Sequence, residues 1–140
     1  MNALPSPGFI AGSTVSPSQF VNISSAGDWT VIPATAGSAI IGVSQDYMAQ
    51  APGTFGADIT VAANTGQGVA VFGAGQIAMV NSGAAITRGQ FIKSDANGNA
   101  IPLTTNNPVV PQFVGGVAME SALAAGNLIR IWVQLGQISQ

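Results

Sequence analysis

Short apolar runs that end at turn residues are the feature that most restricts how this chain can fold. From Asp28 onward these runs are separated by Gly, Pro, Asn and Ser at intervals of about 8 to 12 residues, the spacing of strands in sandwiches and barrels. Helical spacing is scarce. The single candidate, Met119–Ala125, is an Ala-rich stretch that stops at Gly126 and can equally be a wide loop. The pattern predicts an all-β fold, a small barrel or sandwich of short antiparallel strands.

The positions of the strands follow from the same pattern. One hairpin is indicated most strongly, because Asp95-Ala96-Asn97-Gly98 separates two apolar runs and Asn-Gly favours the positive φ angles of a type I′ turn. In the last run Ile129, Ile131, Val133 and Leu135 share one face, which we predict to be the core face. We expect strands at residues 29–32, 38–44, 57–62, 68–72, 76–80, 90–94, 99–103, 112–119 and 128–135, with a further strand at 19–24 if the first 27 residues are not an extended arm.

The first 27 residues differ from the rest. Their prolines disfavour a helix and a central strand, yet the segment carries apolar residues that a disordered tail would lack. We therefore predict an extended N-terminal arm, residues 1–27, and a barrel or sandwich body, residues 28–140. The arm packs on its own body or on a neighbouring molecule, and the alternative is an ordinary edge strand at residues 19–24. The apolar residues of the arm are Phe9, Ile10, Phe20, Val21 and Ile23.

Charged side chains are rare. They make up 6% of the residues, against about 25% in an average soluble domain. Nucleic-acid binding requires several cations, and this chain has only Arg88, Lys93 and Arg130, so we exclude DNA and RNA as primary partners. The apolar runs are too short for a membrane-spanning helix, and no signal peptide is recognisable. So few charges favour a protein whose surface is largely covered by neighbouring molecules. The alternative is a cold-adapted or low-complexity secreted domain.

The residues for common catalytic chemistry are sparse. The chain has no His and no Cys, so the most frequent general base is missing. Lys93 and Ser94 are adjacent, but neighbours on a strand point to opposite faces. Asp46 and Glu120 are the best candidates for a carboxylate pair, because they occupy related positions in a weak internal repeat. We expect no catalytic site and no enzyme activity.

Metal and cofactor sites are not indicated either. The segment Asp95–Asn99 resembles part of a calcium loop, but Thr104 stands where such a loop needs a Glu. The paired glycines around residues 66–68 and 73–75 open no helix that could cradle a phosphate. We expect no cofactor and no metal. Of the two tryptophans, we predict that Trp29 belongs to the core, whereas Trp132 is either core or a binding anchor.

The second half of the chain resembles the capsid cement, or decoration, proteins of tailed bacteriophages. The likeness spans residues 75–133 and consists of a strand, a DxxG turn and a strand, followed by a GxA segment, an Ala-rich turn, a Gly and a closing strand. It rests on the segments Gly89–Ala100, Gly115–Glu120 and Ala124–Val133. Asn127 replaces the Glu often found after the turn Gly. The resemblance implies a compact β barrel, often trimeric, on the outer surface of a virion.

A function follows from that resemblance. It implies a structural virion protein, made in the host cytoplasm, that binds the outside of the major capsid protein shell and cements adjacent capsomers. We expect a homo-oligomer, a trimer in preference to a dimer, and no membrane partner. The alternatives are another phage virion component, such as a head fibre base or a tail protein, and a carbohydrate-binding β module. The predicted protein interface comprises Phe9, Ile10, Phe20, Val21, Ile23 and Trp132, and a chain that lacks residues 1–27 is expected to keep a folded body.

Overall fold

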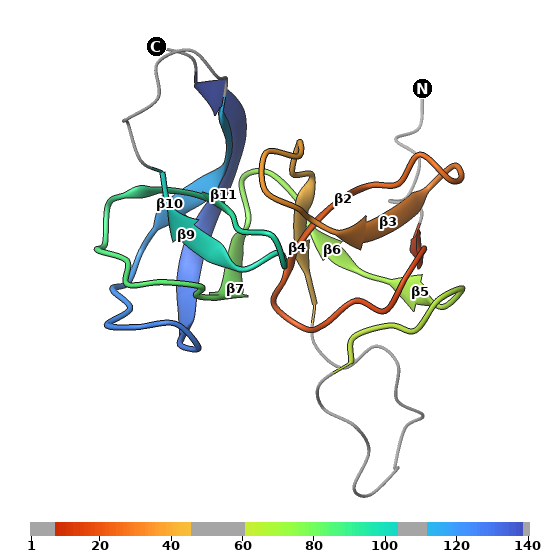
Figure 1. Cartoon of the computed structure of the whole chain (residues 1–140), viewed down its shortest axis with the longest axis horizontal. Helices are drawn as coiled ribbons and strands as arrows, with labels where there is room; N and C mark the ends of the chain where they lie inside the picture. Colours follow the sequence, from red (N-terminus) through yellow and green to blue (C-terminus); the bar gives the residue numbers. More distant parts are fainter. Residues whose placement is uncertain (1–7, 46–60, 104–111, 139–140) are drawn as a thin grey trace, which may run out of the picture.

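The computed structural model describes residues 8–45, 61–103 and 112–138, and in this part of the chain it contains strands and no helix (Figure 1). The prediction of an all-β fold is therefore confirmed. The first sheet contains β1 (Phe9–Ala11), β2 (Phe20–Ile23), β3 (Thr30–Pro33), β4 (Gly42–Ser44), β5 (Gly68–Val69) and β6 (Val71–Phe72). The second contains β7 (Ile77–Asn81), β8 (Phe91–Ser94), β9 (Ala100–Pro102), β10 (Gln112–Ala118) and β11 (Leu128–Ile138).

The first sheet curls into a nearly closed barrel. Its strand order is β5-β1-β3-β2-β4-β6, so the two outermost strands, β5 and β6, are consecutive pieces of one extended run. Ala70 lies between them, and its carbonyl accepts a hydrogen bond of 2.9 Å from the N–H of Gln45. Because β5 and β6 are two residues each, this near closure leaves little exposed sheet edge that could pair with other chains. The barrel interior is packed by Ala11, Val15, Val21, Val31, Ala63 and Val69.

One strand pair departs from the expected antiparallel arrangement. β1 and β3 are parallel, with Ile10 opposite Thr30, whereas the other strand pairs of the described residues are antiparallel. The parallel pair arises because the chain crosses from β1 to β2 and returns through a turn to β3, which then lies between β1 and β2. Such a long-range arrangement leaves no signature in the local apolar pattern, because a parallel connection needs a crossover rather than a tight turn.

The second sheet packs beside the barrel (Figure 1), and the two share one core. Its order is β7-β11-β10-β8-β9. Alternate residues of β11 point into the core, as the sequence predicts: Ile129, Ile131 and Val133 are buried and Leu135 packs against them. The barrel contributes side chains from its outer surface, since successive residues of a strand face opposite ways. The barrel residues of this core are Phe20, Ala34, Ile40 and Val43.

The barrel and the second sheet pack closely at Phe20 and Gly115. A Cβ atom on Gly115 would lie 2.6 Å from the ring of Phe20 and 3.1 Å from the Ile40 side chain. The neighbouring backbone is joined by hydrogen bonds, from the N–H of Phe20 to the carbonyl of Gly98 (2.8 Å) and from Asn81 to Ser18 (2.9 Å). The ring therefore occupies the space that a side chain at position 115 would need.

Side-chain amides close several turns. In three of them the residue after a Gly is Gln, and its Oε1 accepts the N–H of the residue three positions earlier, over 2.7–2.8 Å. Each of these glycines has a positive φ of 84–85°, as the third position of a type II turn requires. A fourth turn has the same closure with Ser18 in place of Gly. These turns are Ser16–Gln19, Asn64–Gln67, Gly73–Gln76 and Thr87–Gln90.

The hairpin at residues 95–99 is confirmed, but its turn is not of type I′. Gly98 has a φ of 81°, whereas Asn97 has no positive φ. The Asp95 carboxylate accepts hydrogen bonds from the N–H groups of Asn97 (2.7 Å) and Asn99 (2.9 Å). The Asp95 side chain thus accepts N–H groups that would otherwise need a backbone carbonyl as partner. The loop needs only one residue of left-handed conformation, Gly98, as in three-residue hairpin loops.

Other expectations have mixed outcomes. The expected strands at 19–24, 29–32, 68–72, 76–80, 112–119 and 128–135 correspond to observed strands within one or two residues at their starts, and β11 runs on to Ile138. Of the expected run at 38–44 only Gly42–Ser44 is a strand. The segment Met119–Ala125 is a loop, in which Ala122 forms an isolated bridge with Ile86. Most of the strand expected at 57–62 lies outside the described residues, as does Asp46.

The described part of the expected arm belongs to the barrel. β1 lies between β5 and β3, and β2 lies between β3 and β4. Val21 packs inside the barrel and Phe20 packs in the core shared with the second sheet. Along the chain, the first sheet ends at Phe72 and the second begins at Ile77, so the boundary between them does not lie near residue 27. In the structure, therefore, residues 28–140 do not form a body separate from the described part of residues 1–27, because both cores draw residues from that segment.

Deleting residues 1–27 should abolish cooperative unfolding. The deletion removes β1 and β2, opens the barrel in two places and takes Phe20 and Val21 out of the two cores. We expect a truncated chain without a thermal transition by circular dichroism. A chain that lacks only residues 1–7 keeps every described strand and serves as the control. A transition of the long truncation equal to that of the full chain would contradict the barrel.

Substituting Gly115 by Ala should destabilise the fold. The new methyl group would collide with the Phe20 ring, and overpacking of this kind costs about 1–3 kcal/mol. Gly136→Ala is the matched control on the neighbouring strand, because a Cβ there meets no atom within 4 Å. Urea unfolding followed by tryptophan fluorescence measures both. Equal stability of the two variants would show that the contact is not tight in solution.

Candidate binding surfaces

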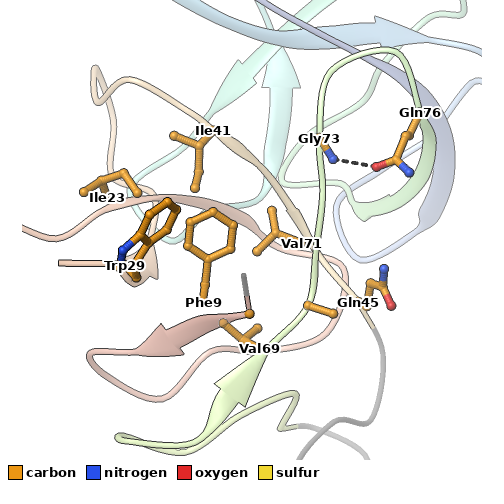
Figure 2. Close-up of a pocket in the computed structure, with 11 residues that line it drawn as sticks. Phe9, Ile23, Trp29, Ile41, Gln45, Val69, Val71, Gly73 and Gln76 are labelled. Carbon is orange, nitrogen blue, oxygen red and sulfur yellow. Dashed lines mark hydrogen bonds between the residues drawn. The ribbon is translucent and has the colours of Figure 1, made fainter. Parts of the chain in front are cut away.

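The mouth of the barrel forms an open groove (Figure 2) of about 780 Å³. The rings of Phe9 and Trp29 lie on one side, with their centroids 6.1 Å apart and their planes tilted by 48°. Two amide side chains, Gln45 and Gln76, lie toward the other side. The volume is within the range of small-molecule sites, about 300–1,000 Å³. The aliphatic side chains of the lining are Ile23, Ile41, Val69 and Val71.

Trp29 has an unusual backbone conformation. Its φ is 55°, in the left-handed region where a bulky residue is an outlier, at a cost of about 1–3 kcal/mol. The turn before β3 imposes this angle, because the Thr30 hydroxyl donates to the carbonyl of Asp28 (3.1 Å) and the Thr30 carbonyl accepts from Ser24 (2.8 Å). The Trp29 side chain nevertheless remains 56% exposed. The prediction that Trp29 belongs to the core is wrong, because the turn directs its ring to the barrel mouth.

A second surface lies on the outer face of the second sheet. The strand register places Ile77 opposite Trp132, Trp132 opposite Val117, and Val117 opposite Phe91. These four residues form one apolar row across four strands, about 14 Å long at ordinary strand spacing. Three of the four are large and about half exposed: Ile77 (57%), Trp132 (52%) and Phe91 (46%). Further exposed apolar side chains on the same sheet or its loops are Met79, Met119, Leu123 and Leu128. We call this row and its neighbours the outer apolar face.

One ion pair borders the outer apolar face. Arg130 donates from Nε to Oε1 of Glu120 (2.9 Å), its NH2 group donates to the same oxygen, and its backbone N–H donates to Oε2 (2.9 Å). These hydrogen bonds, from the side chain first and the backbone second, lower the pKa of Glu120, and the bond to Glu120 raises the pKa of Arg130. The Glu120 carboxylate is therefore held as an anion by its partner, which does not suit it to donate a proton at neutral pH.

The structure separates the predicted interface residues into three groups. Phe20 and Val21 have no exposed surface, so the folded chain offers neither to a partner, and their assignment to an interface is corrected. Phe9 and Ile23 line the groove at the barrel mouth. Ile10 is exposed on β1 without lining the groove, and Trp132 lies in the outer apolar face.

Several surface residues escaped the sequence analysis. Trp29 was assigned to the core, and Ile77, Phe91 and Val117 were read only as strand residues. The alternation along β11 places Trp132 away from the core, but it does not reveal which residues stand beside it. Those neighbours are set by strand order and register, which are long-range properties.

Groups of ligands for a metal ion are missing from the described residues, where no three of His, Cys, Asp or Glu are clustered. In the same residues there is no helix with the length and apolar character needed to cross a bilayer. The groove at the barrel mouth and the outer apolar face are therefore the candidate binding surfaces of the described residues.

The fold is similar to that of a known virion protein. The structure matches the crystal structure of the head fiber gp8.5 N base in bacteriophage phi29 with a TM-score of 0.62 and 18% sequence identity, over 94% of this chain and 95% of that chain. At this identity the likeness establishes a shared fold. No protein-family model matches the sequence, and no curated protein matches it at a significant level.

Replacing Glu120 by Gln should reduce stability slightly at neutral pH. A lowered pKa in the folded state stabilises the fold above the ordinary value of 4.5, and this contribution disappears as the pH falls through the folded-state pKa. The two melting temperatures should therefore converge in acid. The effect should be small because both side chains are exposed. A variant difference that grows below about pH 4 would contradict the assignment.

Proposed function

We propose that this chain is a structural protein of the phage virion that binds the outer surface of the head. The observation that carries the proposal is the match to the head fiber N base, which extends over nearly the full length of both chains. The resemblance of residues 75–133 to capsid cement proteins supports the same general role. The chain then acts by binding and not by catalysis, with the major capsid protein and copies of itself as partners.

The outer apolar face is the proposed contact with the head. Large apolar patches on a soluble protein mark interaction sites, and this one places Trp132 in a row with Ile77, Val117 and Phe91. Tryptophan is enriched among the residues that dominate binding free energy. A chain that binds only the assembled shell stabilises it by mass action, and many copies on one lattice add avidity.

Two versions of this role differ in their consequences. As the base of a head fibre, the chain serves as an attachment point, and the structural likeness favours this version. As a cement protein, it clamps adjacent capsomers, and copies on the order of hundreds per particle are expected on a symmetric lattice. Copy number and the effect on head stability distinguish the two. In either version we propose a homo-oligomer, with a trimer in preference to a dimer.

Trp132→Ala should weaken attachment to the head. The loss of a central tryptophan weakens binding by about 2 kcal/mol or more, which corresponds to roughly 30-fold in affinity. The assay is co-sedimentation of the purified chain with heads of its own phage that lack this protein. Trp29→Ala is the matched control, because Trp29 is exposed to a similar extent but lies in the groove. Light scattering of each variant reports the oligomeric state separately.

Two outcomes of this assay would contradict the proposal. Failure of the unaltered chain to sediment with heads overturns the proposed function. Sedimentation that Trp29→Ala abolishes and Trp132→Ala leaves intact overturns the choice of the outer apolar face. Binding through apolar contacts should also persist at high salt, because few charges take part.

A further inference from the structure

Trp29 separates two hollows of different character. On one side lies the groove at the barrel mouth. On the other lies a shallower hollow of about 500 Å³, bordered by the turn residues Ser24, Ser25 and Asp28. Ile23 and Trp29 line both. A ligand that extends across the Trp29 ring would therefore contact an apolar surface on one side and hydroxyl and carboxylate groups on the other.

The polar groups of the groove are uncharged amides. The described residues that line the groove are uncharged, so they offer no counter-charge to a phosphate, sulfate or carboxylate. The Oε1 atom of Gln76 accepts the N–H of Gly73 at 2.8 Å, which orients the carboxamide (Figure 2). Gln45, which directly follows β4, supplies a second carboxamide on the same side of the groove as Gln76. Each carboxamide offers both a donor and an acceptor to a ligand.

A pyranose ring has the matching chemistry. One of its faces consists of C–H groups that stack on an aromatic ring, and its rim carries hydroxyl groups that donate and accept hydrogen bonds. We propose that the groove, with the Trp29 ring as one of its walls, binds a neutral oligosaccharide of two or three units. One unit stacks on Trp29 and reaches the amides of Gln45 and Gln76. The next extends toward Asp28, whose carboxylate accepts hydrogen bonds from hydroxyl groups and disfavours acidic sugars.

An apolar peptide is the alternative occupant, and the structure favours it less. The aliphatic walls of the groove would accept its side chains. Beside the groove, however, the outermost strands β5 and β6 are only two residues long, and each is paired on one side, to β1 and to β4. Their free edges therefore offer little of the main-chain pairing by which extended peptides add to a sheet. The second hollow, bordered by Ser24, Ser25 and Asp28, also suits hydroxyl groups better than apolar side chains.

The two tryptophans of the chain make a direct test possible. In a Trp132→Phe background Trp29 is the only tryptophan, so its fluorescence reports on the groove alone. The probes are the neutral trisaccharides maltotriose, cellotriose, chitotriose and mannotriose. At least one should give a saturable change, with a Kd of about 10 mM or lower. Calorimetry of the unaltered chain with the same sugar gives an independent affinity.

Variants then locate the binding. Trp29→Ala should weaken binding about tenfold or more, as the loss of an aromatic stacking partner does, whereas Trp132→Ala should leave it unchanged. Gln76→Leu, which keeps the groove apolar and removes the amide, should also weaken it. Circular dichroism confirms that each variant is folded. Asp28→Asn should allow a uronic acid trisaccharide to bind more tightly than it binds the unaltered chain.

Three outcomes would overturn the proposal. The first is the absence of a saturable change with every trisaccharide up to about 10 mM. The second is binding that Trp29→Ala does not weaken. The third is saturable binding of apolar hexapeptides only. The proposal does not depend on attachment to the head, since head binding is tested through Trp132 and saccharide binding through Trp29, so each can fail alone.

Discussion

The contact between the Phe20 ring and the glycine backbone at Gly115 is the interaction on which the arrangement of the two sheets depends. Phe20 belongs to the barrel, yet its side chain is completely buried in the core shared with the second sheet. Gly115 leaves the space that the ring fills. Because packed interiors tolerate little change in volume, this pair holds the barrel and the sheet in one relative position. The groove at the barrel mouth and the outer apolar face therefore each lie on strands that this packing holds in place.

The scarcity of charge has a structural counterpart in the turns. Glutamine amides close turns after glycines of positive φ, and the Asp95 carboxylate is taken up by the hairpin loop. Polar side chains are thus used locally, to satisfy backbone groups that would otherwise face water unpaired. One ion pair, Arg130–Glu120, stands beside the outer apolar face. Large apolar side chains, among them Trp29, Ile77 and Trp132, remain exposed in the part of the chain that the structure describes.

The two exposed tryptophans give the chain two distinct surfaces. Trp132 lies in a row of apolar side chains that crosses the second sheet, the surface that we propose as the contact with the head. Trp29 stands at a hollow with amide groups nearby, the surface that we propose for a neutral saccharide. The two proposals are compatible, because they use different strands and different side chains.

The sequence by itself determined the elements that depend on neighbouring residues. Most strand positions, the hairpin around Asn97-Gly98 and the inward face of β11 follow from local periodicity and turn residues, whereas β1 was not expected and β4 is shorter than the run at 38–44. The predicted interface included Phe9, Ile23 and Trp132, which lie at the two surfaces. Even the glutamine turns left a signal, since Gly-Gln recurs at each of the three glycine-containing ones.

The tertiary structure alone decided which strands meet. The closure of the barrel through Ala70, the parallel pairing of β1 with β3 and the burial of Phe20 and Val21 each join segments that are far apart in the chain. Apolar alternation shows that a residue faces one side of a strand, but not whether that side meets a core, a groove or solvent. For this reason the sequence predicted Trp29 to be a core residue. The turn that directs its ring outward is a property of the tertiary structure.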